Sequence, residues 1–103
     1  MNEFTKIIFD TDGTLVYLPG TPGKIADSPR YDVINFLLYL HKLGCQIYAH
    51  SGGGVEYCQN KIDRIGLTDI VTVVPKGSMI ADISFDDEEV KLGKVNIQVN
   101  KIF

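Results

Sequence analysis

Two aspartates separated by one residue lie early in the chain, in the stretch FDTDGTLV of residues 9–16. Asp10 and Asp12 follow an apolar run and precede Gly13 and Thr14, where a strand should end. Asp-x-Asp-Gly stretches are also common in turns, since Asp and Gly favour them. The apolar run before the pair and the Thr-Leu after it favour catalysis over a plain turn. One carboxylate of such a pair could attack phosphorus, while the other moves a proton to or from the leaving group.

Other polar residues also come after apolar runs. They are Ser51, Gly52 and Gly53 after residues 45–49, Lys76 after residues 70–74, and Asp86 and Asp87 after residues 81–85. If these runs are parallel strands, their carboxyl ends meet at one edge of the sheet, where such sheets bind ligands. Carboxylates gathered there repel each other, and a hard divalent cation such as Mg²⁺ is the simplest compensation. With a lysine and a hydroxyl nearby, the edge would form a cradle for a phosphoryl group.

Each of these residues also has a plain structural interpretation. Ser51 with its glycines could be a flexible loop or a helix cap, and Lys76 after a proline could be a solvated surface lysine. The acidic run that begins at Asp86 could be a helix start, which the helix dipole favours. His50 directly precedes Ser51, so we expect its side chain on the opposite side of the strand, in a structural role.

Five short stretches are typical of β-strands. Three are compact apolar runs, and the last two alternate apolar with polar side chains, the fifth as an edge strand with one wet face would. They cover residues 6–9, 45–49, 70–74, 81–85 and 95–99.

Two stretches with apolar residues at helical spacing predict helices. The first begins with Ser28 as N-cap and Pro29 in its first position, and it ends at Gly44. The second covers residues 55–65 and ends at Gly66. Strands that alternate with helices predict a three-layer, Rossmann-like α/β domain with a mainly parallel sheet of about five strands.

The composition limits the classes of protein to consider. A chain of 103 residues, 45% hydrophobic and 22% charged, predicts one globular domain over residues 1–103. The net charge of −3 argues against a broad nucleic-acid surface. No apolar stretch approaches the roughly 20 residues that span a bilayer, and the N-terminus lacks a secretory layout, so we expect a cytoplasmic protein without a membrane partner. Cys45 and Cys58 are too few for a disulfide framework and are predicted to be reduced core residues.

The first motif and the order of the later ones resemble the haloacid dehalogenase-like superfamily. In that family an apolar strand runs into Asp-x-Asp-Gly-Thr, as in FDTDGTLV. A strand that ends in Ser (IYAHSGG), a lysine, and a strand that ends in an acidic pair (ISFDDEE) then follow in the family's order. The resemblance covers about residues 4–90. Most relatives place a full helix between the lysine and the acidic pair, whereas small phosphatase-like relatives have a compressed segment similar to the one between Lys76 and Asp86.

The resemblance implies catalytic roles for three residues. Asp10 would be the nucleophile that forms an aspartyl-phosphate. Asp12 would be the general acid and then the base that activates water, and its backbone carbonyl would help to bind Mg²⁺. Lys76 would neutralise charge on the nucleophile and the phosphoryl group.

The resemblance also implies which residues bind substrate and metal. Ser51 would hold the phosphoryl oxygens, helped by the amides of Gly52 and Gly53. Asp10 and Asp86 would supply side-chain ligands to the metal, with Asp87 as a second ligand of the acidic pair or an outer partner.

Asp12 indicates the branch of the superfamily, because the dehalogenase branch lacks this acid and the transport ATPases carry threonine there. The resemblance thus implies a Mg²⁺-dependent phosphatase that hydrolyses a phosphomonoester through an aspartyl-phosphate. Residues 16–27 leave room only for a short flap, so we expect no cap domain. An uncapped site is open to solvent: the phosphorylated substrate could be large, such as a protein, a sugar polymer or a nucleic-acid end, or a partner subunit in a homo-oligomer could cover it.

Two alternatives remain. The domain could be a phosphate-binding or regulatory module that keeps the acidic cluster without turnover. A receiver-like phospho-acceptor has similar residues at its strand ends, but there the acidic pair comes early and the accepting aspartate follows a later strand, so the order of motifs disfavours it.

Overall fold

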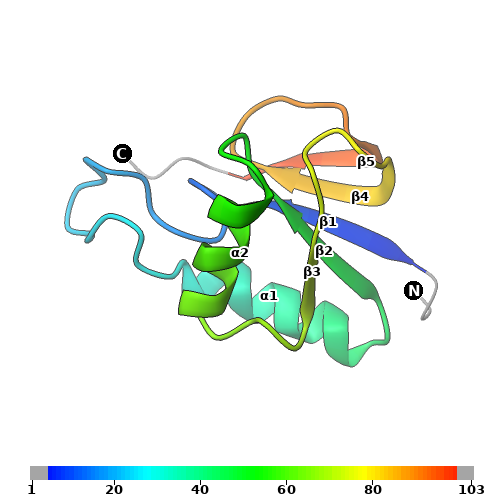
Figure 1. Cartoon of the computed structure of the whole chain (residues 1–103), viewed down its shortest axis with the longest axis horizontal. Helices are drawn as coiled ribbons and strands as arrows, with labels where there is room; N and C mark the ends of the chain where they lie inside the picture. The colour runs from blue at the N-terminus through cyan, green and yellow to red at the C-terminus, as the bar shows by residue number, and fades with distance from the viewer. Residues whose placement is uncertain (1–4, 100–103) are drawn as a thin grey trace.

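A computed structural model describes residues 5–99 of the chain (Figure 1). The strands in this range are β1 (Lys6–Asp10), β2 (Gln46–His50), β3 (Val71–Val73), β4 (Ala81–Asp86) and β5 (Gly93–Gln98), and the helices are α1 (Tyr31–Lys42) and α2 (Val55–Arg64). Each lies within a few residues of a predicted strand or helix.

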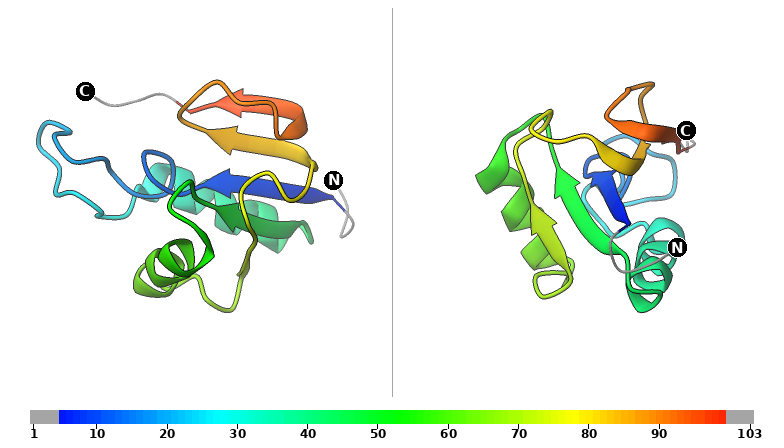
Figure 2. Two further views of the ribbon diagram at one scale, coloured as in Figure 1. Left: turned by 45° about the horizontal axis from the view of Figure 1, so that its top comes forward. Right: turned by 90° about the vertical axis from the view of Figure 1, so that its right-hand side faces the viewer.

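The five strands form one parallel sheet in the order β3-β2-β1-β4-β5. The left view of Figure 2 shows β1, β4 and β5 as arrows that point the same way. The predicted α/β class with a parallel sheet is therefore confirmed. β1 is the central strand, with β2 on one side and β4 on the other, and this explains why its apolar residues are buried without alternation.

The hydrophobic core lies on one face of the sheet. The strand register places Ile7 beside Ile47, and Ile47 beside Val71, so these side chains share a face. Both helices contribute to the same buried cluster, α1 through residues such as Leu37 and α2 through residues such as Ile62. Their apolar residues at helical spacing thus form the faces that pack on the sheet.

The opposite face of the sheet is covered by a chain segment. Residues 74–80 run from the end of β3 to the start of β4 without a helix. They carry Lys76 toward the end of β1, where its Nζ lies 3.4 Å from Oδ1 of Asp10. Ile8 belongs to this face because it alternates with Ile7, and it is also buried. The spacing between Lys76 and the acidic pair at Asp86 is short because the chain crosses this face of the sheet directly, without a helix.

Helix α1 begins later than the sequence predicts. Its N-cap is Arg30, which makes no side-chain cap hydrogen bond, whereas Oγ of Ser28 donates to a carbonyl three residues earlier. The chain is still extended at this point, because Pro29 forms an antiparallel bridge with Val16. This pairing closes residues 16–29 into a hairpin-like loop, which we call the flap and which projects beyond the sheet in Figure 1.

Strand β5 is more exposed than its alternating pattern predicts. The pattern implies one buried face, yet Val95 is 55% and Ile97 42% exposed. β5 lies at the edge of the sheet, whereas α1 packs against β2 and α2 packs against β2 and β3, so the apolar side chains of β5 stay partly exposed. Asn100, the last residue of the pattern, lies outside the described residues.

Cys45 and Cys58 are both buried and free of disulfides, as predicted. Among residues 5–99, neither helix has the length and apolar character that crossing a membrane requires.

Candidate active site

Three of the predicted site residues meet at the carboxyl ends of β1 and β4. Asp10 ends β1 and Asp86 ends β4, and both are buried, Asp86 to 2% exposure. Nζ of Lys76 lies 3.4 Å from Oδ1 of Asp10 and 3.5 Å from Oδ2 of Asp86. The crossing segment therefore delivers the lysine between the two carboxylates.

Burial and mutual repulsion perturb the charges in this cluster. Burial and the nearby Asp86 carboxylate together raise the pKa of Asp10 to about 7, although Lys76 opposes the rise. Burial disfavours the charged form of Lys76, but Asp10 and Asp86 outweigh this effect and raise the pKa of its ammonium. One lysine thus compensates part of the negative charge, and Asp10 keeps a proton in much of the metal-free protein near neutral pH.

This shift predicts how stability depends on pH. The folded state holds the Asp10 proton up to a pKa of about 7, against an ordinary aspartate pKa of 3.8, so the wild type loses stability as the pH rises between these values. Asp10→Asn cannot lose this proton. In chelator, we expect it to unfold like the wild type near pH 4 and to be more stable near pH 8 by on the order of 2–4 kcal/mol.

Urea unfolding of both proteins across this pH range measures the difference. Asp69→Asn, which alters an exposed carboxylate, is the matched control and should show no such trend. A difference between Asp10→Asn and wild type that does not grow with pH would contradict the perturbed carboxyl.

His50 belongs to the same cluster, whereas the sequence predicts only a structural role for it on the side of the strand opposite Ser51. The register pairs His50 with Asp10, and partners in a parallel sheet point to the same face. Ligand atoms of Asp10, His50 and Asp86 all lie within 4.8 Å of one another. Burial and the nearby Lys76 ammonium together lower the pKa of the His50 imidazole to about 4, although Asp86 opposes the shift. His50 therefore faces the same side of the sheet as its partner Asp10. A comparison of His50 with the adjacent Ser51 alone does not reveal this shared face.

Asp87 is also buried, and it packs against the glycine of the first motif. Gly13 has φ +79°, and a Cβ placed on it would lie 2.2 Å from Oδ2 of Asp87. Burial and the hydrogen bond and charge of Asp86 raise the pKa of Asp87. The glycine after the second aspartate therefore provides both a left-handed backbone and room for an acidic side chain from the end of β4.

Gly13→Ala should be strongly destabilising for these two reasons. The left-handed conformation costs an alanine about 1–2 kcal/mol, and displacement of Asp87 adds to it, so we expect a total of about 2–4 kcal/mol. Gly20→Ala is the matched control, because Gly20 has φ +87° but a Cβ placed on it would meet no atom within 4 Å. Denaturant unfolding compares the two variants. Equal losses would mean that Asp87 does not pack against Gly13 in solution.

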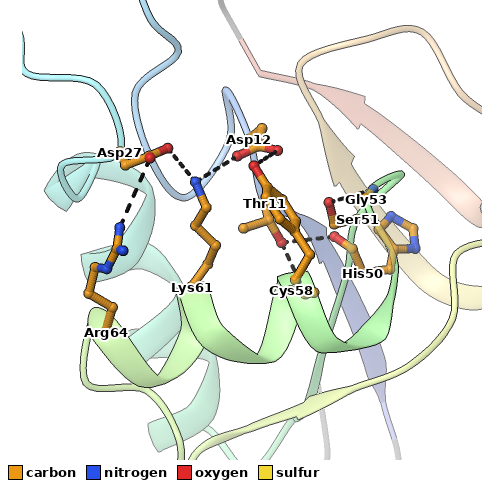
Figure 3. A network of polar contacts seen from close by, with 10 residues as sticks. Thr11, Asp12, Asp27, His50, Ser51, Gly53, Cys58, Lys61 and Arg64 are labelled. Atoms are coloured by element: carbon orange, nitrogen blue, oxygen red, sulfur yellow. Dashed lines mark hydrogen bonds and ion pairs between the residues drawn. The ribbon is translucent and has the colours of Figure 1, made fainter.

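Asp12 points into a separate polar network, shown in Figure 3. The hydroxyl of Tyr57 donates to Oδ2 of Asp12 at 2.9 Å, and Nζ of Lys61 lies 3.6 Å from Oδ1. Lys61 also donates to Asp27 in the flap, and Arg64 lies 4.0 Å from the same carboxylate. Two residues of α2 therefore hold Asp12 in place, and one of them ties the flap to the helix.

Tyr57 and Lys61 are functional candidates that the sequence patterns above do not include. Lys61 lies three residues after Cys58, beside the apolar stripe of α2, and it is buried like Cys58 and Ile62. A lysine next to the buried stripe of a helix is the signal that could have identified it, since buried lysines need a charged partner.

Thr11 separates the environments of the two aspartates. Its Oγ1 donates to the backbone carbonyl of His50 at 2.8 Å and lies 3.3 Å from Sγ of Cys58 (Figure 3). The residue between Asp10 and Asp12 is thus anchored between β2 and α2, which fixes the positions of both neighbours.

Ser51 and its glycines follow β2 but make no hydrogen bond to the carboxylate cluster among residues 5–99. Ser51 is buried, and its Oγ accepts a hydrogen bond from the N–H of Gly53 at 3.1 Å. A Cβ on Gly53 would lie 2.7 Å from the Tyr57 ring, whereas Gly52 is exposed. The predicted phosphate loop is therefore close-packed against α2 at one glycine and open at the other.

Known proteins offer little guidance on function beyond this geometry. No protein-family model and no curated protein matches the chain. Among solved structures, the chain resembles YjhP from E. coli, a structural genomics target, with 9% identity and a TM-score of 0.38. The match covers 82% of this chain and 31% of YjhP, so the chain spans about a third of that protein.

Proposed function

We propose that the chain is a Mg²⁺-dependent phosphatase of the haloacid dehalogenase-like superfamily, which hydrolyses a phosphomonoester through an aspartyl-phosphate. The observation that carries this proposal is the contrast between two neighbouring carboxylates. Asp10 is buried beside Lys76 and Asp86, whereas Asp12 is partly exposed and held by hydrogen-bond donors from α2. Paired titratable groups in unlike environments are typical of a site that divides nucleophilic and acid–base work.

In the first step, a carboxylate oxygen of Asp10 attacks phosphorus and the bond from phosphorus to the ester oxygen breaks. Asp12 donates a proton to the departing oxygen, so the product leaves as an alcohol. Lys76, 3.4 Å from Asp10, balances negative charge on the carboxylate and on the transferred group.

In the second step, Asp12 accepts a proton from water as the water oxygen attacks the aspartyl-phosphate. The bond between phosphorus and the Asp10 oxygen breaks, which releases inorganic phosphate and restores the carboxylate. Tyr57 and Lys61 orient Asp12 for both transfers, because each contacts a different oxygen of its carboxylate.

The donor set is suited to a hard cation. Among residues 5–99, Oδ2 of Asp86 is buried without a hydrogen bond and makes the ion pair with Lys76 at 3.5 Å, and the nearby Asp10 and Asp87 add further carboxylate oxygens. We propose that these three side chains and the backbone carbonyl of Asp12 hold Mg²⁺. When bound, the cation would supply positive charge that keeps Asp10 ionised and neutralises phosphoryl oxygens.

The size of the substrate follows from what covers the site. Between β1 and α1 the described chain contains only the flap, held to α2 by Lys61 and Asp27. A flap of this length leaves an open approach to the strand ends, which suits a phosphate on a large molecule better than a small enclosed metabolite.

Hydrolysis of an aryl phosphate, with Mg²⁺ and with chelator, tests the proposal. We expect Mg²⁺-dependent turnover by the wild type, none by Asp10→Asn, and wild-type rates for the surface control Asp69→Asn. If the wild type is as inert as Asp10→Asn across a broad panel of phosphate esters, the phosphatase proposal fails. Binding of inorganic phosphate by that inert protein would then support the phosphate-binding module.

A further inference from the structure

We infer that the strand ends form a binding site for a first-row transition cation, of the series from Mn²⁺ to Zn²⁺, with His50 as a ligand beside Asp10 and Asp86. The inference rests on the proposed function for the role of the cation, and it names which cation the site prefers. It adds a nitrogen ligand that the resemblance does not imply.

Proximity is the first support for a shared cation. One ligand atom from each of Asp10, His50 and Asp86 lies within 4.8 Å of the others. Nitrogen and oxygen ligands bind such cations at about 2.0–2.2 Å, so two ligands of one cation lie up to about 4 Å apart. The three side chains are therefore close to the separation that a shared cation requires, and they come from three adjacent strand ends.

The unsatisfied state of the imidazole is the second support. His50 is only 1% exposed, and neither Nδ1 nor Nε2 has a hydrogen-bond partner. Oδ2 of Asp86 is also buried without a hydrogen bond, and its contact is the ion pair with Nζ of Lys76 at 3.5 Å. Leaving a buried polar atom without a partner is destabilising, and a histidine that serves only packing normally donates one ring N–H to a nearby acceptor. A cation between the ring nitrogen and Asp86 satisfies both groups.

The types of ligand atom determine which cation the site prefers. Mg²⁺ prefers oxygen ligands and retains several waters, whereas imidazole nitrogen suits transition cations such as Zn²⁺ and Fe²⁺. Asp10 and Asp86 alone would suit Mg²⁺, and His50 moves the preference toward the later cations of the series. The site should therefore bind Zn²⁺ and Mn²⁺ more tightly than Mg²⁺.

The chain offers a matched pair of variants, because it contains two histidines, His41 and His50. His41 is exposed on α1, away from the three ligands. Calorimetric titration of wild type, His50→Gln and His41→Gln with Zn²⁺, Mn²⁺ and Mg²⁺ needs no phosphate ester. We expect His50→Gln to weaken Zn²⁺ and Mn²⁺ binding about tenfold or more and Mg²⁺ binding less than about twofold. His41→Gln should change none of them.

A second measurement uses the wild type alone and so does not depend on the folding of a variant. Imidazole NMR signals of the two histidines should respond differently, with those of His50 shifted by Zn²⁺ and broadened by Mn²⁺ at one equivalent. The inference is overturned if His50 does not respond, if both variants bind Zn²⁺ equally, or if the wild type binds Mg²⁺ as tightly as Zn²⁺.

Failure of the proposed function has a different outcome. If the protein binds Zn²⁺ through His50 but hydrolyses no phosphate ester, the proposed phosphatase activity is refuted and the inferred cation site is supported. If instead Mg²⁺ supports hydrolysis that His50→Gln leaves intact, and Zn²⁺ binding does not depend on His50, the phosphatase proposal is supported and the inferred cation site is refuted.

Discussion

Asp12→Asn should stop turnover halfway and leave a phosphoryl group on Asp10. An aryl phosphate has a leaving group that needs little protonation, so attack by Asp10 should still proceed. The second step needs a base to take a proton from water, and loss of general base catalysis costs about 10²–10⁴-fold in rate. We expect a burst of one aryl alcohol per protein, followed by turnover slower by that factor. Intact mass spectrometry should show the added phosphoryl group.

Two further variants make this result specific. Tyr57→Phe removes only the hydroxyl that donates to Asp12 at 2.9 Å, so it should slow turnover far less than Asp12→Asn and accumulate little adduct. Asp10→Asn should accumulate none. An adduct that persists in Asp10→Asn, or that never forms in Asp12→Asn, would show that the nucleophile or the base is assigned incorrectly.

Lys76→Gln should lower both the stability and the turnover of the protein. Its ammonium is within 3.5 Å of both Asp10 and Asp86, and removing it leaves these buried carboxylates without that cation. We expect a loss of about 1–3 kcal/mol in unfolding free energy near pH 8 in chelator. The loss should be much smaller near pH 5, because Asp10 is then protonated in the folded state. Turnover should fall by about 10²–10³-fold, as for loss of a group that stabilises transition-state charge.

Lys94→Gln is the matched control for Lys76→Gln. Lys94 also pairs with an aspartate, Asp82, at 3.3 Å, but its side chain is 76% exposed. Exposed ion pairs contribute about 0–1 kcal/mol, so this variant should change stability little at either pH and leave turnover intact. If denaturant unfolding gives equal losses for the two lysines, Lys76 does not compensate the carboxylate cluster.

The residues that the sequence places correctly are those whose positions depend on strand direction alone. Asp10 and Asp86 each end an apolar run, and in a parallel sheet all such ends lie at one edge. Lys76 follows for the same reason, since it comes directly after the region of β3. No knowledge of exact register or helix orientation is needed to bring these three together.

The residues that the sequence misses depend on contacts between elements. His50 joins the cluster because of its register with Asp10, which the composition of either strand does not encode. Tyr57 and Lys61 reach Asp12 because of how α2 is rotated toward the chain after β1. Ser28 has the residue type of an N-cap, but pairing of Pro29 with Val16 keeps the chain extended and overrides that local preference.

The central place of β1 has a consequence for how the chain reaches its folded state. Ile7 pairs with Ile47 on one side and with Ile83 on the other, so the first strand completes its hydrogen bonding only after most of the chain has been synthesised. Such distant pairing slows folding, and a nascent or truncated chain without β4 would present β1 as an open apolar edge. Truncation before residue 81 should therefore yield a product that self-associates through the exposed edge of β1.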